Sequence, residues 1–551
     1  MEVKILLYNF LNLSKIHKVI FTMSASLVEL AEFREYPKPR KEVEIEGKID
    51  KSSKLLRKYV DRGSDVLEEI TADNFRWGVV PRLSPHDVRV LPEGTRLVRV
   101  PEEIVDKVMK ERSYDLITWN LPYRFLKRLE IGQKSFVPPV EGNSRVIDRL
   151  SEDGIVVSFD DLRSTPPEPV GKRYSRTENN NGQEINIAGQ ARIPFALGSV
   201  PDVGSFLSYV TMAQANGMAL VSRDKQLSDI SEQAKLVGEI INYLRNGDLT
   251  EAKELVPNDA QLTRFLKLVR EDGDIPREQA FQMYEEALRE SWVGNVGAAI
   301  EASDKGLRRA EALYDVGCRL FRVYSPEGGL EIPQTVKELK DNFGNEARAI
   351  GGQVMHVSTG QRTEEAGADA LMTGISGGSQ CSTSVMTDIP VSTPNFIYDL
   401  RGKVGIPIGI EGGGVGTHVI TALNLGASFL SKPGEIGVSL EGAGGKLLFA
   451  DPQERYYMIY GGEASRSAKW WKDSMDSLGR PNFVEGETGI REVTEDRISM
   501  TRNLRNLLED ELSTGLAFQH ASSISELHSR DCSGVVQVTR DAAEKSKPYA
   551  T

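Results

Sequence analysis

The sequence predicts an α/β protein built on a closed barrel of parallel strands. Short apolar runs that end at glycines recur in the second half of the chain, as at 371–374 and 405–412, and segments with helical periodicity separate them. The stretch 405–430 contains a complete unit of strand, glycine turn, helix and new strand. About five such alternations precede Cys381 and at least two follow it, which is the pattern of a (β/α)8 TIM barrel.

Composition narrows the class of protein. A chain of 551 residues is too long for one compact core, so a barrel with an additional domain or insertions is expected. The net charge of −12 argues against a nucleic-acid-binding surface. The three cysteines, Cys318, Cys381 and Cys532, lack metal-site spacing and cannot all pair, which favours a reducing compartment and a cytoplasmic protein.

The N-terminus is expected to carry no targeting or membrane segment. Its apolar stretches at 4–11 and 19–23 are interrupted by polar and charged residues, and no run reaches membrane-spanning length. We therefore expect no membrane partner. Met23 is an alternative start to Met1, with the first 22 residues as an extension.

The chain divides into three predicted regions. Residues 1–150 form an N-terminal extension or small α+β domain of unknown role, with a helix at 51–67 and a strand leading into a helix at 98–105. Residues 151–545 form the barrel, whose first strand is expected within 191–199. Residues 239–290 interrupt it with two or three amphipathic helices, an insert of unknown role.

The later elements follow in order along the chain. We expect a helix at 206–214, strands at 218–222, 293–300, 319–323 and 349–354, helices at 308–316 and 417–425, and an amphipathic helix at 497–512. Lone histidines such as His520 and His528 are expected to be surface or core residues rather than catalytic groups.

The glycine-rich segment after the strand at 371–373 carries the most distinctive chemistry. Glycines and serines alternate between Gly374 and Ser379, so backbone N–H groups can turn inward to hold an anion, and Cys381 follows at once. A thiol reacts as its thiolate, which such N–H groups would stabilise. Taken alone, the segment favours a glycine-rich turn followed by a half-buried structural cysteine over a catalytic one.

Three motifs together resemble the IMP dehydrogenase / GMP reductase family. They are Gly-Ala-Asp-Ala at 367–370, Gly-Gly-Ser-x-Cys-x-Thr at 377–383, and the strand that ends in Glu411, Gly412 and Gly413. The resemblance covers roughly residues 155–545. The family places paired regulatory CBS domains where this chain carries 239–290, which is too short to hold them.

The resemblance implies roles in catalysis. Cys381 would attack C2 of a purine ring and form a thioimidate, while Thr383 and Glu485 would help to handle water and protons. Arg480 would correspond to the arginine that activates water, although Pro481 stands where a tyrosine is expected. The structural alternatives are a helix cap for Thr383 and a solvated loop carboxylate for Glu485.

The resemblance also implies binding roles. Glu411, with a solvated strand end as its alternative, would bind the ribose hydroxyls. The nucleotide would be held by Ser379, Gly378, Glu411, Gly412, Gly413, Tyr460, Gly461 and Lys432. The cofactor, NAD or alternatively NADPH, would lie at Tyr324, Ser325 and Gly374. The carbonyls of Ser376, Gly378 and Cys381 would face a potassium ion.

Several positions depart from the family pattern. Tyr324 stands where the family has an aspartate, Gln353 replaces an asparagine, and Glu411 replaces the usual aspartate. Pro433 and the glycine after it align with the second phosphate-binding Gly-Ser, so Lys432 is expected to restore charge near the phosphate.

Three functions are therefore open. The first is a dehydrogenase that converts IMP, NAD and water into XMP, and the second is a GMP reductase that uses NADPH and releases ammonia. The third is a repurposed or inactive nucleotide-binding paralogue. The resemblance implies a homotetramer and a purine nucleotide substrate.

Overall fold

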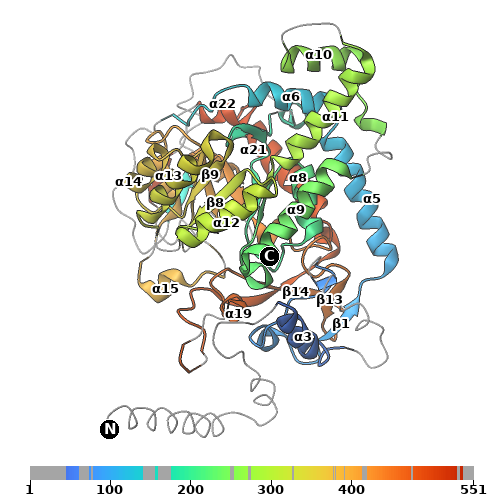
Figure 1. The fold of residues 1–551 in the computed structure, drawn as a ribbon, viewed down its shortest axis with the longest axis vertical. Coiled ribbons are helices and arrows are strands. Elements are labelled where there is room, and N and C mark those ends of the chain that lie inside the picture. The colour runs from blue at the N-terminus through green and yellow to red at the C-terminus, as the bar shows by residue number, and fades with distance from the viewer. Residues whose placement is uncertain are drawn as a thin grey trace, which may run out of the picture.

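The computed structural model describes most of the chain outside its N-terminus. The described residues are 45–60, 74–75, 78–140, 155–158, 175–180, 182–247, 253–270, 275–325, 328–375, 378, 380–389, 391–412, 419–472, 476–478, 480–529 and 534–537. Figure 1 shows how the elements built from them are arranged.

Eight parallel strands close into a barrel, as predicted. Neighbouring strands pair in sequence order, and the last returns to the first through Leu430 opposite Phe195. Because helices cover the outside and side chains fill the inside, the strands are buried on both faces and read as continuous apolar runs. The strands are β5 (Phe195–Leu197), β6 (Met218–Val221), β7 (Val296–Glu301), β8 (Leu320–Tyr324), β9 (Arg348–Gly352), β10 (Ala370–Thr373), β11 (Ile408–Glu411) and β12 (Phe429–Ser431).

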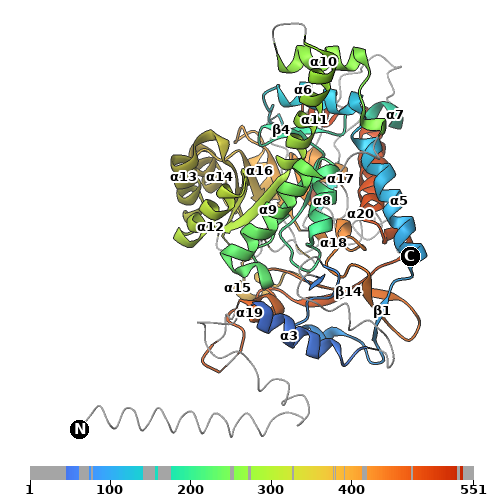
Figure 2. The ribbon, with the colours of Figure 1, turned by 45° about the vertical axis from the view of Figure 1, so that its right-hand side comes forward.

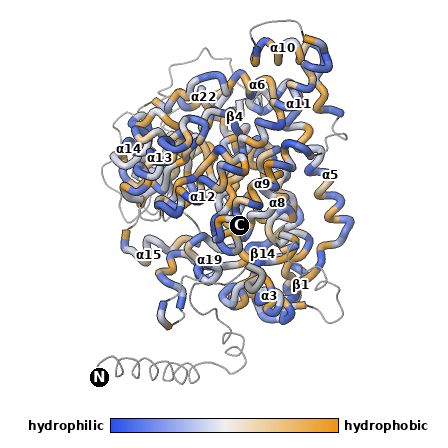
Figure 3. The backbone as a smooth tube through the Cα atoms, in the orientation of Figure 1, coloured by the Kyte–Doolittle hydropathy of each residue, from blue (hydrophilic) through white to orange (hydrophobic). Residues whose placement is uncertain are grey.

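Helices surround the barrel and turn their apolar faces toward it. In Figure 3 hydrophobic and hydrophilic segments alternate along these helices. Side-chain caps fix where several begin: Ser303 accepts from the Gly306 amide at the start of α12, and Asp229 accepts from the Ser231 amide at the start of α9. The helices are α8 (Phe206–Gln214), α9 (Ile230–Asn246), α12 (Asp304–Asp315), α13 (Glu331–Phe343), α14 (Val357–Glu365), α16 (Thr393–Leu400) and α17 (Val419–Leu425).

A four-stranded antiparallel sheet lies at the end of the barrel that holds the cavity described below. Its order is β1 (Arg96–Arg99), β13 (Leu447–Ala450), β14 (Tyr456–Gly461) and β15 (Thr488–Glu492). The N-terminal region thus supplies an edge strand to a sheet built from the C-terminal half. α3 (Ile45–Leu56) and this sheet share one hydrophobic cluster that includes Leu56, Phe449 and Trp471.

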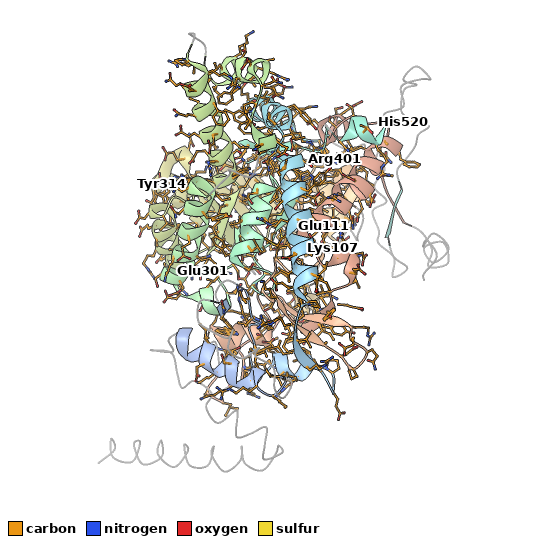
Figure 4. All side chains as sticks on the ribbon, turned by 90° about the vertical axis from the view of Figure 1, so that its right-hand side faces the viewer. Lys107, Glu111, Glu301, Tyr314, Arg401 and His520 are labelled. Carbon is orange, nitrogen blue, oxygen red and sulfur yellow. The ribbon has the colours of Figure 1, made fainter. Side chains whose placement is uncertain are left out.

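The described residues up to 140 also join the main core. α5 (Glu102–Trp119) and α6 (Pro122–Gly132) bury Val105, Trp119 and Phe125 in the same cluster as the barrel. α5, which carries Lys107 and Glu111 (Figure 4), lies beside α20 (Met500–Arg505). Glu111 accepts from Arg502 on α20, and Lys107 pairs with Glu495, just before α20. The domain boundary at residue 150 stays a prediction.

The region 239–290, predicted as an insert, overlaps the end of α9 and most of α11 (Arg277–Val293), and it contains the 3-10 helix η4 (Lys253–Leu255) and α10 (Asp259–Val269). α10 packs on α6 and α11, and α11 packs on α9. Figures 1 and 2 place α10 at the end of the molecule opposite the four-stranded sheet. α10 is therefore remote from the cavity described below, and no described residue of 239–290 lines that cavity.

The remaining elements are short. The helix expected at 497–512 is divided, because α20 continues into a π-helical segment, η7. The helix expected at 51–67 begins earlier, at Ile45, and ends at Leu56. The other elements are η2 (Asp87–Val90), β2 (Ile155–Ser158), α7 (Arg176–Asn179), β3 (Ile185–Ile187), β4 (Gln190–Arg192), η3 (Lys225–Ser228), η5 (Gly344–Glu346), α15 (Thr383–Thr387), α18 (Pro433–Ile436), α19 (Arg466–Trp471), η6 (Glu495–Arg497), η7 (Asn506–Ser513), α21 (Thr514–Phe518), α22 (Ile524–His528) and β16 (Gly534–Gln537).

Within the described part of the chain, no helix combines the length and the apolar character needed to cross a membrane.

Burial of His528 makes stability depend on pH. Its Nε2 lies 2.9 Å from the carbonyl oxygen of Ala427, and burial lowers the pKa of its imidazole to about 4. Because the folded-state pKa is below the ordinary value of 6.5, the unfolded chain binds the proton more readily. The contribution of neutral His528 is therefore complete above about pH 6.5 and is lost as the pH falls toward 4, by about 3 kcal/mol.

We expect the melting temperature of the wild type to fall more steeply between pH 7 and pH 4.5 than that of His528→Gln. The control is His356→Gln, because His356 is exposed at the start of α14. If the melting temperatures of the wild type and His528→Gln fell equally between pH 7 and pH 4.5, buried His528 would not be the source of this pH dependence.

Candidate active site

A cavity of about 620 Å³ opens where the C-terminal ends of the barrel strands face the four-stranded sheet. This volume is in the range of small-molecule sites, and this end of the barrel is where enzymes of the fold carry their chemistry. Residues from the barrel strands line one side of the cavity, and Tyr460, Glu463, Glu485 and Arg491 from the sheet and its loops line the other.

Cys381, Thr383 and Glu485 form a continuous hydrogen-bond chain in this cavity. The Cys381 thiol donates to Thr383 Oγ1 over 3.2 Å, and the Thr383 hydroxyl donates to Glu485 Oε2 over 3.0 Å. Thr383 is the first residue of α15, and this bond to Glu485 uses the hydroxyl proton. The three residues can therefore pass a proton from sulfur to carboxylate.

Backbone pairing explains why Glu485 meets Thr383. The Ser382 amide donates to the Glu485 carbonyl over 2.8 Å, and the Glu487 amide donates to the Gln380 carbonyl over 2.8 Å. Cys381 and Gly486 form an antiparallel bridge between these bonds. The loop after β10 is thus fastened to the segment before β15.

Glu411 at the end of β11 is held by a buried arginine. Arg322, whose side chain is 1% exposed, donates to Glu411 Oε2 and to the hydroxyl of Ser199. Gln353 Nε2 donates to the same Oε2 atom over 2.7 Å. Burial raises the pKa of Glu411, and the charge of Arg322 opposes this shift.

Arg322 was not identified from the sequence. The sequence feature that marks it is a charged residue within the otherwise apolar strand β8. Successive side chains of a strand point to opposite faces, so Arg322 and Tyr324 point into the barrel, whereas Phe321 points outward and packs against Phe343. A charge at an inward position of a barrel strand is expensive unless it is paired, so it indicates an acidic partner on another strand.

Tyr324 lines the cavity between two guanidinium groups. Arg322 lies 4.7 Å and Arg223 5.1 Å from its ring centroid. Arg223 pairs in turn with Glu463, which follows β14, and with Glu301, 3.5 Å away, at the end of β7. Burial raises the pKa of the Tyr324 hydroxyl well above its ordinary value, which keeps it a neutral donor.

Cationic side chains gather around Tyr460. Arg491 lies 5.3 Å from its ring centroid and lines the cavity together with Lys432 and Arg497. Lys432 Nζ also donates to Glu435 over 2.6 Å, so its charge is partly balanced within the protein. Ser431, 1% exposed, has a hydroxyl with no hydrogen-bond partner among the described residues.

The structure brings together most, but not all, of the predicted site residues. The described residues that line the cavity are Cys381, Thr383, Glu485, Gly378, Glu411, Gly412, Tyr460, Lys432, Tyr324 and Gly374. Ser376, Ser379 and Gly413 are outside the described residues.

Three predicted site residues do not line the cavity. Arg480 is exposed and pairs with Asp476 over 2.9 Å. The hydroxyl of Ser325 donates to Glu331 on α13, and the amide of Gly461 donates to Asp202 over 2.8 Å. Asp202 is 259 residues from Gly461, so the local sequence could not reveal this partner, whereas Asp476 and Glu331 lie only four and six residues from Arg480 and Ser325.

Polar groups in the cavity remain available for a ligand. Among the described residues, Gln353 Oε1 and Ser431 Oγ are buried and have no hydrogen-bond partner. Such groups fit a polyhydroxylated nucleotide. Among the residues that the structure describes, no three His, Cys, Asp or Glu side chains form a group that could hold a metal ion.

Gly374 allows the cysteine loop to leave β10 closely beside β11. Its φ is +124°, and a Cβ atom there would come within 1.9 Å of the Glu411 carbonyl oxygen. We expect Gly374→Ala to lower the free energy of unfolding, measured by chemical denaturation, by about 1–3 kcal/mol. Gly462→Ala, whose Cβ would meet no atom within 4 Å, is the control and should unfold like the wild type. Equal stability of the two variants would contradict this account of the loop.

A family model described as IMP dehydrogenase / GMP reductase domain matches residues 159–549. An inosine-5'-monophosphate dehydrogenase of Aquifex aeolicus (strain VF5) is 28% identical over 243 residues, which cover 43% of this chain and 48% of that protein.

Two further relatives carry the same name. The protein of Cryptosporidium parvum is 26% identical over 271 residues, covering 48% of this chain and 64% of its own. The protein of Rhodopirellula baltica is 28% identical over 348 residues, which cover 62% of this chain and 57% of that protein. The matched segments thus span about half to two thirds of these relatives. Because the family model covers well over half of the chain, the protein belongs to the IMP dehydrogenase / GMP reductase family.

Proposed function

We propose that the protein is a purine nucleotide oxidoreductase that converts IMP, NAD and water into XMP and NADH. The observation that supports this most strongly is the hydrogen-bond chain from the Cys381 thiol through Thr383 to Glu485 at the edge of the cavity. Family membership and the acidic Glu411 at a strand end in the same cavity support a nucleotide substrate.

The residues divide the reaction into two stages. Cys381 loses its proton toward Thr383 and Glu485, and its sulfur adds to C2 of the purine. A bound nicotinamide supplies the acceptor for the hydride that leaves C2, and the product on Cys381 is a thioimidate. Glu485 then releases the thiol proton to solvent, so that the Thr383–Glu485 pair can accept a proton from the water that adds to C2. The carbon–sulfur bond breaks, XMP leaves and the thiol is restored.

Water activation is assigned to Thr383 and Glu485 rather than to Arg480. Arg480 is 68% exposed at its side chain and bound to Asp476, whereas Glu485 lines the cavity and accepts the Thr383 hydroxyl proton. A carboxylate that already accepts a hydrogen bond from the hydroxyl next to the nucleophile is placed for general-base work.

The second candidate is a GMP reductase. The exposed position of Arg480 favours it, because reduction of GMP requires no activated water. In that reaction Glu485 and Thr383 would protonate the departing ammonia, and NADPH would supply the hydride. The third candidate, a nucleotide-binding paralogue without turnover, is favoured by Tyr324 at the position of the family's aspartate.

Cofactor and assembly are part of the proposal. Tyr324 and Gly374 share the cavity with Cys381 and would lie beside the nicotinamide. The carbonyl of Gly378 accepts the Cys381 amide over 2.9 Å and keeps a second lone pair, so it can still bind a potassium ion. We also propose a homotetramer, by analogy with the family.

The assay is the absorbance of reduced nicotinamide in two mixtures. IMP with NAD should give a rise, and GMP with NADPH should give no fall. A fall in the second mixture alone would select the reductase. No change in either, with IMP still bound by calorimetry, would select the paralogue and overturn the proposed oxidoreductase.

Substitutions test the relay. We expect Cys381→Ser to abolish turnover, and Thr383→Val and Glu485→Gln each to lower kcat by about 100-fold or more, because the proton route is cut. Thr387→Val, at the other end of α15, is the control for Thr383→Val and should retain most of the activity. A Glu485→Gln enzyme with wild-type kcat would remove Glu485 from the mechanism.

A further inference from the structure

The Arg322–Glu411 pair links three strands beneath the cavity. Arg322 on β8 reaches Glu411 at the end of β11 and Ser199 just beyond β5. Its side chain is 1% exposed, whereas that of Glu411 is 20% exposed. The arginine therefore lies under the carboxylate, and the carboxylate faces the cavity.

The two carboxylate oxygens of Glu411 differ in their hydrogen bonds. Oε2 accepts from both Arg322 and Gln353, whereas Oε1 accepts no hydrogen bond from any described residue. Oε1 lies beside the Cα of Gly198, where a Cβ would come within 3.3 Å of it and within 2.3 Å of Ser431 Oγ. The absence of a side chain at Gly198 keeps this point open.

The neighbouring amide is fixed in the same way. Because Gln353 Nε2 donates to Glu411, its Oε1 must be an acceptor, and that oxygen is buried without a partner. The site thus presents two acceptors, Glu411 Oε1 and Gln353 Oε1, which need donors. A vicinal diol supplies two O–H donors on adjacent carbons, whereas a deoxy sugar supplies one fewer.

We propose that Arg322 is a positioning residue that makes the cavity selective for nucleotides with an intact ribose diol. It does so by committing Glu411 Oε2 to the protein and leaving Oε1 for the sugar. The inference rests on the proposed nucleotide substrate and adds to it the group that sets the choice between ribose and deoxyribose. A site built to hydrogen-bond a hydroxyl rejects the analogue that lacks it, since its buried acceptor is then left unpaired.

The test is calorimetric binding of IMP and 2′-deoxy-IMP to the full chain without cofactor. We expect the wild type to bind IMP about 10- to 100-fold more tightly than 2′-deoxy-IMP, the size of one hydrogen bond to a charged acceptor. Arg322→Met should weaken IMP binding and bring this ratio close to one. A wild type that binds both equally, or neither, would overturn the inference.

A double-mutant cycle separates positioning from general damage. If Arg322 acts through Glu411, adding Arg322→Met to Glu411→Gln should change the ratio by less than about two-fold. Arg192→Met removes another buried arginine, one that bonds Asn295 on the far side of the barrel, and should leave the ratio unchanged. If the effects of Arg322→Met and Glu411→Gln on the affinity ratio were fully additive, Arg322 would not act through Glu411.

Arg322→Lys covers the case in which the methionine variant fails to fold. Lysine keeps the charge but cannot reach Ser199 and Glu411 with two parallel donors, so the ratio should fall only in part. A folded Arg322→Lys protein with an unchanged ratio would overturn the inference. The proposed function fails by a different result, the absence of hydride transfer from a protein that still binds IMP selectively.

Discussion

The site depends on the short backbone pairing between the loop after β10 and the segment before β15. Two amide-to-carbonyl bonds of 2.8 Å flank the Cys381–Gly486 bridge and hold a glycine-rich loop against a second element. Glycines give such a loop conformational freedom that would otherwise leave the thiol without a fixed position. The pairing fixes the position of the thiol and also brings Glu485 within hydrogen-bond distance of Thr383. The same backbone contacts therefore determine both where the thiol lies and where its proton can go.

The buried ion pairs beneath the cavity fix the positions of its lining residues more than they stabilise the fold. Burying Arg223, Glu463, Arg322 and Glu411 costs desolvation that their mutual attraction only partly offsets. Such pairs are retained where they fix a geometry, and each of these joins separate elements: Arg223 joins the loop after β6 to the loop after β14, and Arg322 joins β8 to β11. Removing one partner leaves an unpaired buried charge, which costs more than the pair contributes.

The sequence was sufficient to predict the barrel, and the motif residues Cys381, Thr383 and Glu411 line one cavity, since strand periodicity and local motifs are properties of short segments. It could not supply Arg322 as the partner of Glu411, because the two lie 89 residues apart and only closure of the barrel joins them. Arg480 pairs with Asp476, four residues earlier, and does not line the cavity, a difference in side-chain placement that the local motif did not indicate. The edge strand β1 was expected as a strand, but its partner β13 lies in the distant C-terminal half.

The departures from the family pattern are in contact with one another. Gln353 and Glu411 each carry one methylene more than the asparagine and aspartate they replace, and the two side chains bond each other over 2.7 Å. Arg322 pairs with Glu411 and also lies 4.7 Å from the ring of Tyr324, the third departure. Changing any one alone would leave a buried charge or an acceptor unpaired, at a cost of about 1–3 kcal/mol or more. These three departures and Arg322 therefore form one connected site, in which the oxygens that the described residues leave unpaired, Gln353 Oε1 and Glu411 Oε1, are acceptors for a ligand.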